Sequence, residues 1–170
     1  LVGSEMCIRD RGTPAYKDNS PIVSATDRCN MVKLAIKPFD YMSLSTIETD
    51  RPGNTYTADT LAQIYDSYKK IYFIIGADSL LYIQDWYHPE YICSHCHLLC
   101  ANRDNNSASV LIDQKHFLAD KYGAVIDFID VPELPYSSTD IRKKVAMGLS
   151  VKEDVGEEVE EYIKSRKLYV

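Results

Sequence analysis

The chain has 170 residues, 45% of them hydrophobic and 26% charged, which is enough for one domain with a hydrophobic core. Its formal net charge of −6 argues against nucleic acid or an anionic membrane as a partner, and no apolar run approaches the roughly 18 residues of a membrane span. The five cysteines form no disulfide framework and no secretory signal is visible, so we expect a cytoplasmic protein with reduced thiols.

The first eleven residues, LVGSEMCIRDR, show no hydrophobic periodicity that joins them to the rest of the chain. They resemble the translated adapter sequence that occurs at the ends of fragmentary open reading frames. We therefore predict that residues 1–11 are non-native and lie outside the fold, and that residues 12–170 form a single domain. The alternative is a genuine short N-terminal segment.

Helix and strand patterns alternate along residues 12–170. Helices are expected from the N-cap at Ser24 to Pro38, at 54–70, in short pieces after Gly76 and at 89–94, and then at 110–122, 141–147 and 154–167. Strands are expected at 39–45, 71–75, 97–101 and 125–129. The run at 71–75 lacks polar alternation, which is typical of a central strand with both faces buried. The whole pattern predicts an α/β fold with a mainly parallel sheet.

Three hydroxyl residues, Ser137, Ser138 and Thr139, stand where the strand at 125–129 leads into a helix. Backbone N–H groups at a helix start lack partners within the helix, and the helix dipole adds partial positive charge there. Arg142 follows about one turn later, so the segment predicts a site for an anion such as phosphate. The alternative is an ordinary Ser/Thr N-cap with a solvated arginine.

A second group of candidates follows the strand at 71–75. Gly76 stands directly after it, where a glycine lets another molecule approach the backbone. Asp78 can accept hydrogen bonds from ribose hydroxyls or an adenine amine, and ligands of open α/β sheets bind at this edge. The alternative is a simple strand-to-helix turn capped by Asp78 or Ser79.

Three further candidates are aromatic or basic. Trp86, the only tryptophan, and Tyr87 are expected beside the strand ends, where they could stack on a flat ring or fill the helix–sheet junction. Arg103 follows the strand at 97–101 and is expected at the same edge. Lys17 lies in a proline-containing loop next to a helix start, which suits phosphate capture.

The cluster from Cys93 to His97 raises a zinc alternative. It contains one CxxC pair without a matching second half, and a strand spreads ligands rather than gathering them. We therefore predict no metal site of the protein's own in this cluster.

In this order the motifs resemble the bacterial nicotinate-nucleotide adenylyltransferase family over residues 12–170. The matching residues are Pro14-x-x-Lys17, Arg28, Tyr56-Thr57-x-Asp59-Thr60-Leu61, Ile74-Ile75-Gly76-Ala77-Asp78-Ser79-Leu80, Trp86, Arg103, Ser137-Ser138-Thr139-x-Ile141-Arg142 and Tyr162-Ile163…Leu168-Tyr169. The resemblance implies a Rossmann-like nucleotidyltransferase fold. It also implies transfer of AMP from ATP to nicotinate mononucleotide, which gives nicotinate adenine dinucleotide and pyrophosphate in NAD biosynthesis with Mg²⁺ assisting.

The resemblance also assigns roles. The residues implied to bind ATP are Gly76, Asp78, Ser137, Ser138, Thr139 and Arg142. Those implied to bind the pyridine nucleotide are Lys17, Thr57, Trp86, Tyr87 and Arg103. Two alternatives stay open, a related adenylyltransferase with another acceptor such as phosphopantetheine phosphate and a non-catalytic nucleotide-binding module. The oligomeric state, a homo-oligomer included, and the preference between nicotinate and nicotinamide stay open too.

One departure from the family matters. The family opens with a strand and a G-x-F-D-P-x-H-x-G-H segment whose two histidines contact the ATP phosphates, and this sequence contains no such segment. None of its own histidines, His88, His95, His97 and His116, stands in a matching context. We expect a chain truncated at the N-terminus that lacks the first strand and a catalytic residue of its own, is nearly inactive and is poorly stable.

Overall fold

The computed structural model describes residues 6–9, 23–101, 108–132 and 136–170. The chain divides into two compact units, the first made of residues 1–55 and 135–170 and the second of residues 56–134. All strand pairs in the described residues are parallel, which confirms the predicted α/β class with parallel sheets.

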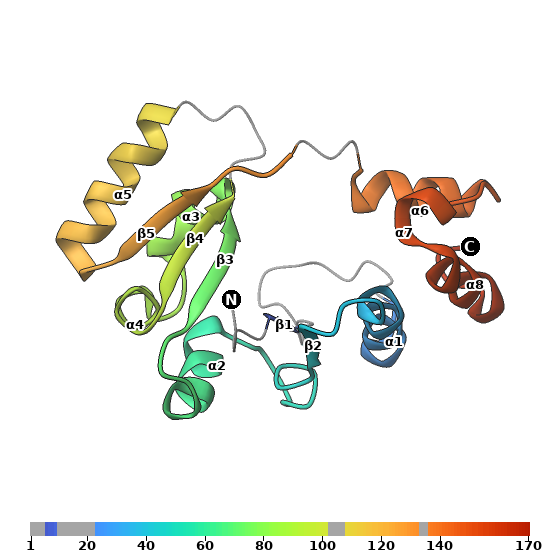
Figure 1. The fold of residues 1–170 in the computed structure, drawn as a ribbon, viewed down its shortest axis with the longest axis horizontal. Helices are drawn as coiled ribbons and strands as arrows, with labels where there is room; N and C mark the ends of the chain where they lie inside the picture. Colours follow the sequence, from blue (N-terminus) through green and yellow to red (C-terminus); the bar gives the residue numbers. More distant parts are fainter. Residues whose placement is uncertain (1–5, 10–22, 102–107, 133–135) are drawn as a thin grey trace. The chain divides into compact units, whose positions relative to one another are not determined.

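The second unit contains the regular alternation of strands and helices (Figure 1). Its elements in chain order are α2 (Thr57–Ile64), η1 (Tyr65–Ser67), β3 (Tyr72–Gly76), α3 (Ala77–Tyr82), η2 (Ile83–Asp85), α4 (Pro89–His95), β4 (His97–Ala101), α5 (Ala108–Tyr122) and β5 (Val125–Ile129). The strands form a sheet in the order β3-β4-β5. The register pairs Tyr72 with His97 and His97 with Val125, so the carboxyl ends of the strands lie along one edge of the sheet.

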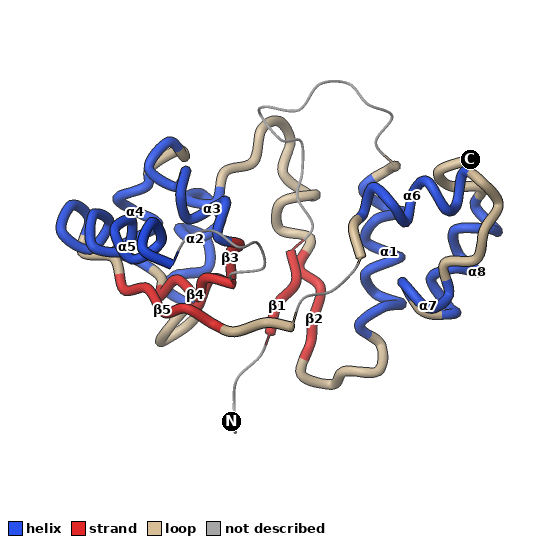
Figure 2. Tube along the Cα trace, turned by 90° about the horizontal axis from the view of Figure 1, so that it is seen from above, coloured by secondary structure: helices blue, strands red, loops and turns tan. Residues whose placement is uncertain are grey.

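The helices of this unit cover one face of its sheet (Figure 2). The core lies between these helices and the sheet, and its largest fully buried side chains are Leu80, Ile83, Ile92, Leu98, Leu118 and Ile126. Leu98 and Cys100 of β4 are both 0% exposed, whereas Leu99 between them is only partly buried. This alternation is expected of a strand whose successive side chains point to opposite faces.

The prediction that the strand at 71–75 is buried on both faces is wrong for this unit. Tyr72 is 51% exposed and Ile74 is 49% exposed, while Ile75 is buried at 6%. Within the described residues β3 pairs with β4 alone. Within the described residues of the second unit, the helices that follow the strands pack on one face of the sheet, which is why the apolar run of β3 is buried on that face alone.

The first unit contains a pair of short strands and four helices in its described residues. They are β1 (Met6–Arg9), α1 (Ala25–Ile36), β2 (Met42–Ser45), α6 (Ser138–Ala146), α7 (Lys152–Val155) and α8 (Glu157–Arg166). The final helix, predicted as one element at 154–167, is two helices that meet at Gly156, whose φ of 86° a glycine adopts readily.

Strand β1 was not expected, because it lies within the segment predicted to be outside the fold. Its four residues pair in parallel with β2, from Met6 opposite Met42 to Arg9 opposite Ser45. Arg9 also forms an ion pair with Glu48, which is 5% exposed. Residues 6–9 thus take part in the first unit, and the non-native origin of residues 1–11 stays a prediction.

A buried carboxylate joins the first helix to the last. Ser24 caps α1 by accepting a hydrogen bond from the Asp27 amide at 3.0 Å, as the sequence predicts. Asp27 in turn accepts from the Tyr162 hydroxyl at 2.8 Å and from Arg166 Nε at 3.3 Å. Its hydrogen bond with the Ser24 hydroxyl, and then that with Tyr162, lowers the pKa of Asp27. The charged form is therefore the one that holds α1 and α8 together.

A second buried carboxylate gives a prediction about acid stability. Glu160 is 7% exposed and binds Lys164 Nζ at 2.8 Å, the Ser150 hydroxyl at 2.6 Å and the Val151 amide at 2.7 Å. These bonds, that with Lys164 first, lower the pKa of Glu160 from 4.5 to about 2. Because the folded-state pKa is the lower one, the stabilisation is complete above pH 4.5 and is lost as the pH falls towards 2.

We expect Glu160→Gln to lower the melting temperature at pH 7 and to flatten its fall between pH 4.5 and pH 2. Thermal melts followed by circular dichroism across this range measure both effects. Glu161→Gln, at an exposed position next in the chain, is the control and should follow the wild-type curve. A Glu160→Gln curve parallel to the wild-type curve would contradict the prediction.

Candidate functional site

Two of the candidates lie at the carboxyl end of β3. Gly76 ends the strand and caps α3 with φ −78° and ψ 161°, a backbone conformation open to any residue. A Cβ atom built there would meet no atom within 4 Å. Neither the backbone nor the packing of the chain therefore requires a glycine at this position. Asp78 lies in the first turn of α3 and its side chain is exposed.

A tilted contact between two aromatic rings brings the next candidates together. Thr57 is the first residue of α2, directly after its N-cap Tyr56. The ring of Tyr56 lies 4.5 Å from the ring of Tyr87, centroid to centroid. The start of α2 and the segment after η2 thus lie side by side.

For Trp86 the sequence left two settings open, a ring that stacks on a flat ligand and a ring that fills the helix–sheet junction. Trp86 is partly buried and packs against the core, with its ring 6.4 Å from that of Phe73 at an interplanar angle of 61°. The indole therefore fills the helix–sheet junction, while its neighbour Tyr87 is 48% exposed. A partly buried Trp86 ring packed against the core suits a surface on which a flat ligand ring could stack.

The hydroxyl-rich segment forms the start of α6 in the first unit. Ser137 is the N-cap and accepts a hydrogen bond from the Asp140 amide at 3.1 Å. Its hydroxyl also donates to the Asp140 carboxylate at 2.5 Å, and this bond, followed by the charge of Lys143, lowers the pKa of Asp140. In this structure Ser137 thus makes the ordinary cap that the sequence left open as the alternative.

The rest of this segment is accessible. Ser138, Thr139 and Arg142 are all exposed. Arg142 Nη2 lies 3.4 Å from Thr139 Oγ1, one turn into the helix. A guanidinium, two hydroxyls and the first turn of a nine-residue helix therefore stand together, which is a chemically suitable setting for a phosphate.

The candidates thus fall into both units. Thr57, Gly76, Asp78, Trp86 and Tyr87 belong to the second unit, and Ser137, Ser138, Thr139 and Arg142 belong to the first. Lys17 and Arg103 lie outside the described residues.

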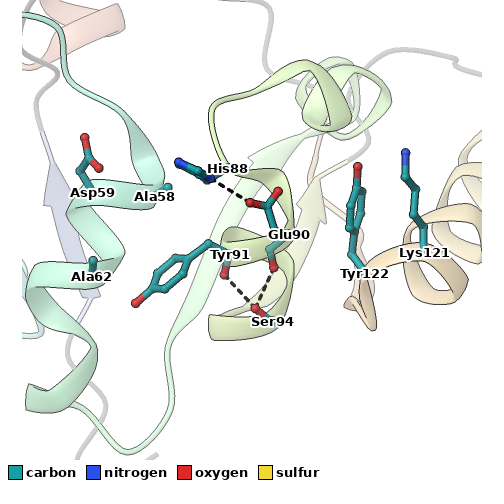
Figure 3. A pocket seen from close by; sticks show the side chains of 9 residues that line it. All are labelled: Ala58, Asp59, Ala62, His88, Glu90, Tyr91, Ser94, Lys121 and Tyr122. Atoms are coloured by element: carbon teal, nitrogen blue, oxygen red, sulfur yellow. Dashed lines mark hydrogen bonds and ion pairs between the residues drawn. The ribbon is translucent and has the colours of Figure 1, made fainter.

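An open groove of about 550 Å³ lies over α4, between α2 and α5 (Figure 3). It is lined by Ala58, Asp59, Ala62, His88, Glu90, Tyr91, Ser94, Lys121 and Tyr122. None of the sequence-predicted site residues lines it, although His88 and Ala58 follow Tyr87 and Thr57 directly in the chain. Ser94 Oγ donates to the Glu90 and Tyr91 carbonyl oxygens at 2.7 and 3.2 Å, so this hydroxyl is engaged by its own helix.

Sequence reasoning missed His88. It has φ 50° and ψ 59°, the left-handed region, and it caps α4. Residues before a proline favour extended backbone, so the His88-Pro89 pair gave no signal of this conformation. Its Nδ1 lies 2.8 Å from Glu90 Oε1, a spacing of two residues that no periodicity marks.

The zinc alternative finds no ligand set in the described part of the chain, where no group of three or more His, Cys, Asp or Glu side chains could hold a metal ion. Cys93 and Cys96 are buried, and burial raises the pKa of the Cys93 thiol to about 11. His95 stacks on Tyr91 at 3.8 Å and His97 pairs with Asp127 at 2.9 Å. These partners account for the cluster by packing.

No helix among the described residues has both the length and the apolarity needed to cross a bilayer.

Comparison with known proteins identifies the class. A parallel α/β unit with ligand-binding candidates at its strand ends is typical of nucleotide-binding enzymes, and residues 7–144 match the cytidylyltransferase-like family. A relative named as a probable nicotinate-nucleotide adenylyltransferase, from Lachnoclostridium phytofermentans, is 35% identical over 159 residues, covering 92% of this chain and 80% of the relative. A second relative of the same name, from Moorella thermoacetica, is 37% identical over 161 residues, covering 93% and 74% of the two chains.

The chain therefore belongs, within the cytidylyltransferase-like family, to the nicotinate-nucleotide adenylyltransferases. A solved structure supports the fold. Plasmodium falciparum nicotinic acid mononucleotide adenylyltransferase complexed with APC superposes with a TM-score of 0.72 at 17% identity, covering 97% of this chain and 82% of that one. The predicted Rossmann-like nucleotidyltransferase fold is confirmed.

Proposed function

We propose that this chain binds ATP and nicotinate mononucleotide as part of the reaction that transfers AMP from the first to the second. The observation that carries the proposal is the 35% identity to a probable nicotinate-nucleotide adenylyltransferase over 92% of the chain. The products are nicotinate adenine dinucleotide and pyrophosphate, in NAD biosynthesis.

The chemistry asks for alignment rather than a protein nucleophile. A phosphate oxygen of the acceptor forms a bond to the α-phosphorus of ATP while the bond from that phosphorus to the pyrophosphate oxygen breaks. Positioning two reactants in line can supply about 7–11 kcal/mol of the barrier. The protein must also offset negative charge on the reacting phosphate, which is a task for cations and backbone N–H groups.

The candidate residues suit these tasks. We assign the ATP phosphates to the start of α6, where Arg142 is the cation, and the adenosine to Gly76 and Asp78 at the end of β3. We assign the pyridine nucleotide to the segments of Thr57 and Tyr87, which the contact between Tyr56 and Tyr87 brings together, with Trp86 beside the pyridine ring. Lys17 and Arg103 are assigned as the cations that bind this nucleotide.

Mg²⁺ supplies charge neutralisation when it enters with ATP. The donors described at the start of α6 are hydroxyls and the Asp140 carboxylate, which Ser137 and Lys143 already engage. These residues fit a Mg²⁺ ion held mainly by triphosphate oxygens and water, which is how this ion usually binds with nucleotides.

Binding and turnover can be tested separately. Isothermal titration with a non-hydrolysable ATP analogue, nicotinate mononucleotide, nicotinamide mononucleotide and phosphopantetheine identifies the ligands, and ATP-dependent pyrophosphate release measures turnover. Because the HxGH motif occurs nowhere in the 170 residues, we expect binding with little turnover. Binding of phosphopantetheine in place of nicotinate mononucleotide would favour the related transferase, and nucleotide binding without any acceptor would favour a non-catalytic module.

Gly76 offers a test of the adenosine assignment. We expect Gly76→Ala to change the free energy of unfolding by no more than about 0.5 kcal/mol, because its φ is ordinary and the added methyl meets no atom within 4 Å. A methyl inserted between the backbone and a close ligand costs about 1–3 kcal/mol, so affinity for the ATP analogue should fall roughly five- to 150-fold.

Gly123→Ala is the matched control for this prediction. Gly123 has a φ of 67°, so alanine there should lower stability by about 1 kcal/mol and leave affinity for the analogue unchanged. Equal affinity of the Gly76→Ala variant and the wild type would place the adenosine elsewhere.

A further inference from the structure

We propose that the hydrogen-bonded pair of His88 and Glu90 is a positioning element that fixes Trp86 and Tyr87 for the pyridine nucleotide. The inference rests on the proposed function, and it adds two residues that neither the motifs nor the resemblance includes. Neither residue is proposed to touch the reacting atoms.

The first observation is a continuous series of side-chain contacts. Glu90 Oε1 lies 2.8 Å from His88 Nδ1. The His88 ring meets the Tyr87 ring in a T-shaped contact with centroids 4.1 Å apart, and Tyr87 lies 4.5 Å from Tyr56. Tyr56 is the N-cap of α2, directly before Thr57. The series therefore runs from the first turn of α4 to the first turn of α2 and holds the exposed Tyr87 ring between them.

The second observation is the backbone of His88. A non-glycine residue in the left-handed region is strained and persists only where its surroundings hold it there. Here the His88 carbonyl accepts from the Tyr91 and Ile92 amides at 3.1 and 3.3 Å, while its side chain is held by Glu90. The direction in which the chain leaves Trp86 and Tyr87 is thus fixed by one strained residue.

The third observation concerns charge around the pair. Glu90 lies in the first turn of α4, where a carboxylate is favoured by the helix dipole, and its bond with His88 lowers the pKa of Glu90. The other charged side chains that line the same groove are Asp59 from α2 and Lys121 from α5. Figure 3 shows the His88 ring turned towards the Glu90 carboxylate in this setting.

The consequence concerns the contacts that position Trp86. Trp86 packs against Phe73 on the side of the core, and the chain runs from Trp86 directly into Tyr87, whose ring contacts the His88 ring. Loss of the pair leaves the core side intact and loosens the solvent side. Since Trp86 is the only tryptophan, its fluorescence reports this change directly.

The test uses His88→Ala, His88→Asn and Glu90→Gln in the full chain, with His116→Ala at an exposed position of α5 as the control. Emission of Trp86 and its quenching by acrylamide are measured without ligand. Titrations then give the dissociation constants of nicotinate mononucleotide and of the ATP analogue. Asparagine tolerates the left-handed conformation and keeps an amide donor for Glu90, so it should restore part of the wild-type behaviour.

We expect His88→Ala to shift Trp86 emission to longer wavelength and to increase acrylamide quenching. The dissociation constant of nicotinate mononucleotide should rise about threefold to tenfold, the size of one lost ring contact, with that of the ATP analogue within twofold of wild type. His88→Asn and Glu90→Gln should lie between His88→Ala and wild type, and His116→Ala should match wild type.

Folded His88 and Glu90 variants with wild-type emission and quenching would overturn the inference, as would an unchanged dissociation constant for nicotinate mononucleotide. Failure of the proposed function looks different, because the wild type itself would then not bind nicotinate mononucleotide. In that case the ligand-free fluorescence still decides whether His88 holds Trp86. If His88→Ala does not fold, His88→Asn and Glu90→Gln carry the same comparison.

Discussion

Replacing Arg142 with alanine is expected to weaken binding of an ATP analogue about 10- to 100-fold, because a hydrogen bond from a charged group to phosphate contributes roughly 1.5–3 kcal/mol. The arginine is exposed and its hydrogen bond to Thr139 is long, at 3.4 Å. Stability should therefore change by less than about 0.5 kcal/mol, as for most surface substitutions. Isothermal titration and chemical denaturation measure the two quantities.

Lys143→Ala is the matched control for this prediction. Lys143 is the next residue of α6, also exposed, and its Nζ lies 3.7 Å from an Asp140 carboxylate oxygen. Lys143→Ala removes the same charge as Arg142→Ala. If general electrostatic attraction alone held the ATP analogue, the two variants would therefore lose the same affinity. A specific role of Arg142 requires a much larger loss for Arg142→Ala, with Arg142→Lys in between because an ammonium cannot bind phosphate with two parallel bonds.

The largest expected effect on stability comes from β4. Leu98→Ala should lower the free energy of unfolding by about 2–5 kcal/mol, because its side chain is 0% exposed and its removal leaves a cavity under the helices. Leu99→Ala removes the same atoms from the opposite face, where the side chain is only partly buried, and should cost clearly less. Urea denaturation of the two variants provides the comparison.

This pair tests the one-sided burial of the sheet. Adjacent residues of one strand differ only in the face to which they point, so backbone propensity and strand position are matched. Equal losses for the two variants would mean that the second face is covered in solution, as the sequence predicted for the neighbouring strand β3.

Local signals explain what the sequence predicted well. Strands β4 and β5 have the predicted bounds, because β4 is a short apolar run and β5 an apolar run that alternates with Asp127. The cap at Ser24 and the end of α5 at Gly123, which has a φ of 67°, depend on one or two residues each and were also predicted. The family followed from short motifs whose order along the chain is more specific than any one of them.

The missed features depend on contacts distant in sequence or on a single dihedral angle. Strand β1 is four residues long and is defined by its pairing with β2, more than 30 residues away in the chain. No hydrophobic periodicity within such a short segment could predict it. The break at Gly156 and the left-handed His88 each rest on one residue. The exposed face of β3 depends on where helices pack, which an apolar run does not specify. For the site, Ser137 could be recognised as a cap or as a phosphate ligand, and the Asp140 three residues later, at the same spacing as Ser24 and Asp27, was a signal for the cap that was not used.

Because most of the cysteines are buried, the rate at which their thiols react with a reagent measures local opening of the structure. Cys29, Cys93, Cys96 and Cys100 are buried and Cys7 is exposed. Only the thiolate reacts with alkylating reagents, and burial raises the pKa of both Cys93 and Cys100. A maleimide dye should therefore label the native chain quickly at Cys7 alone, and the slower labelling of Cys93, Cys96 and Cys100 would measure how often the core of the second unit opens to water.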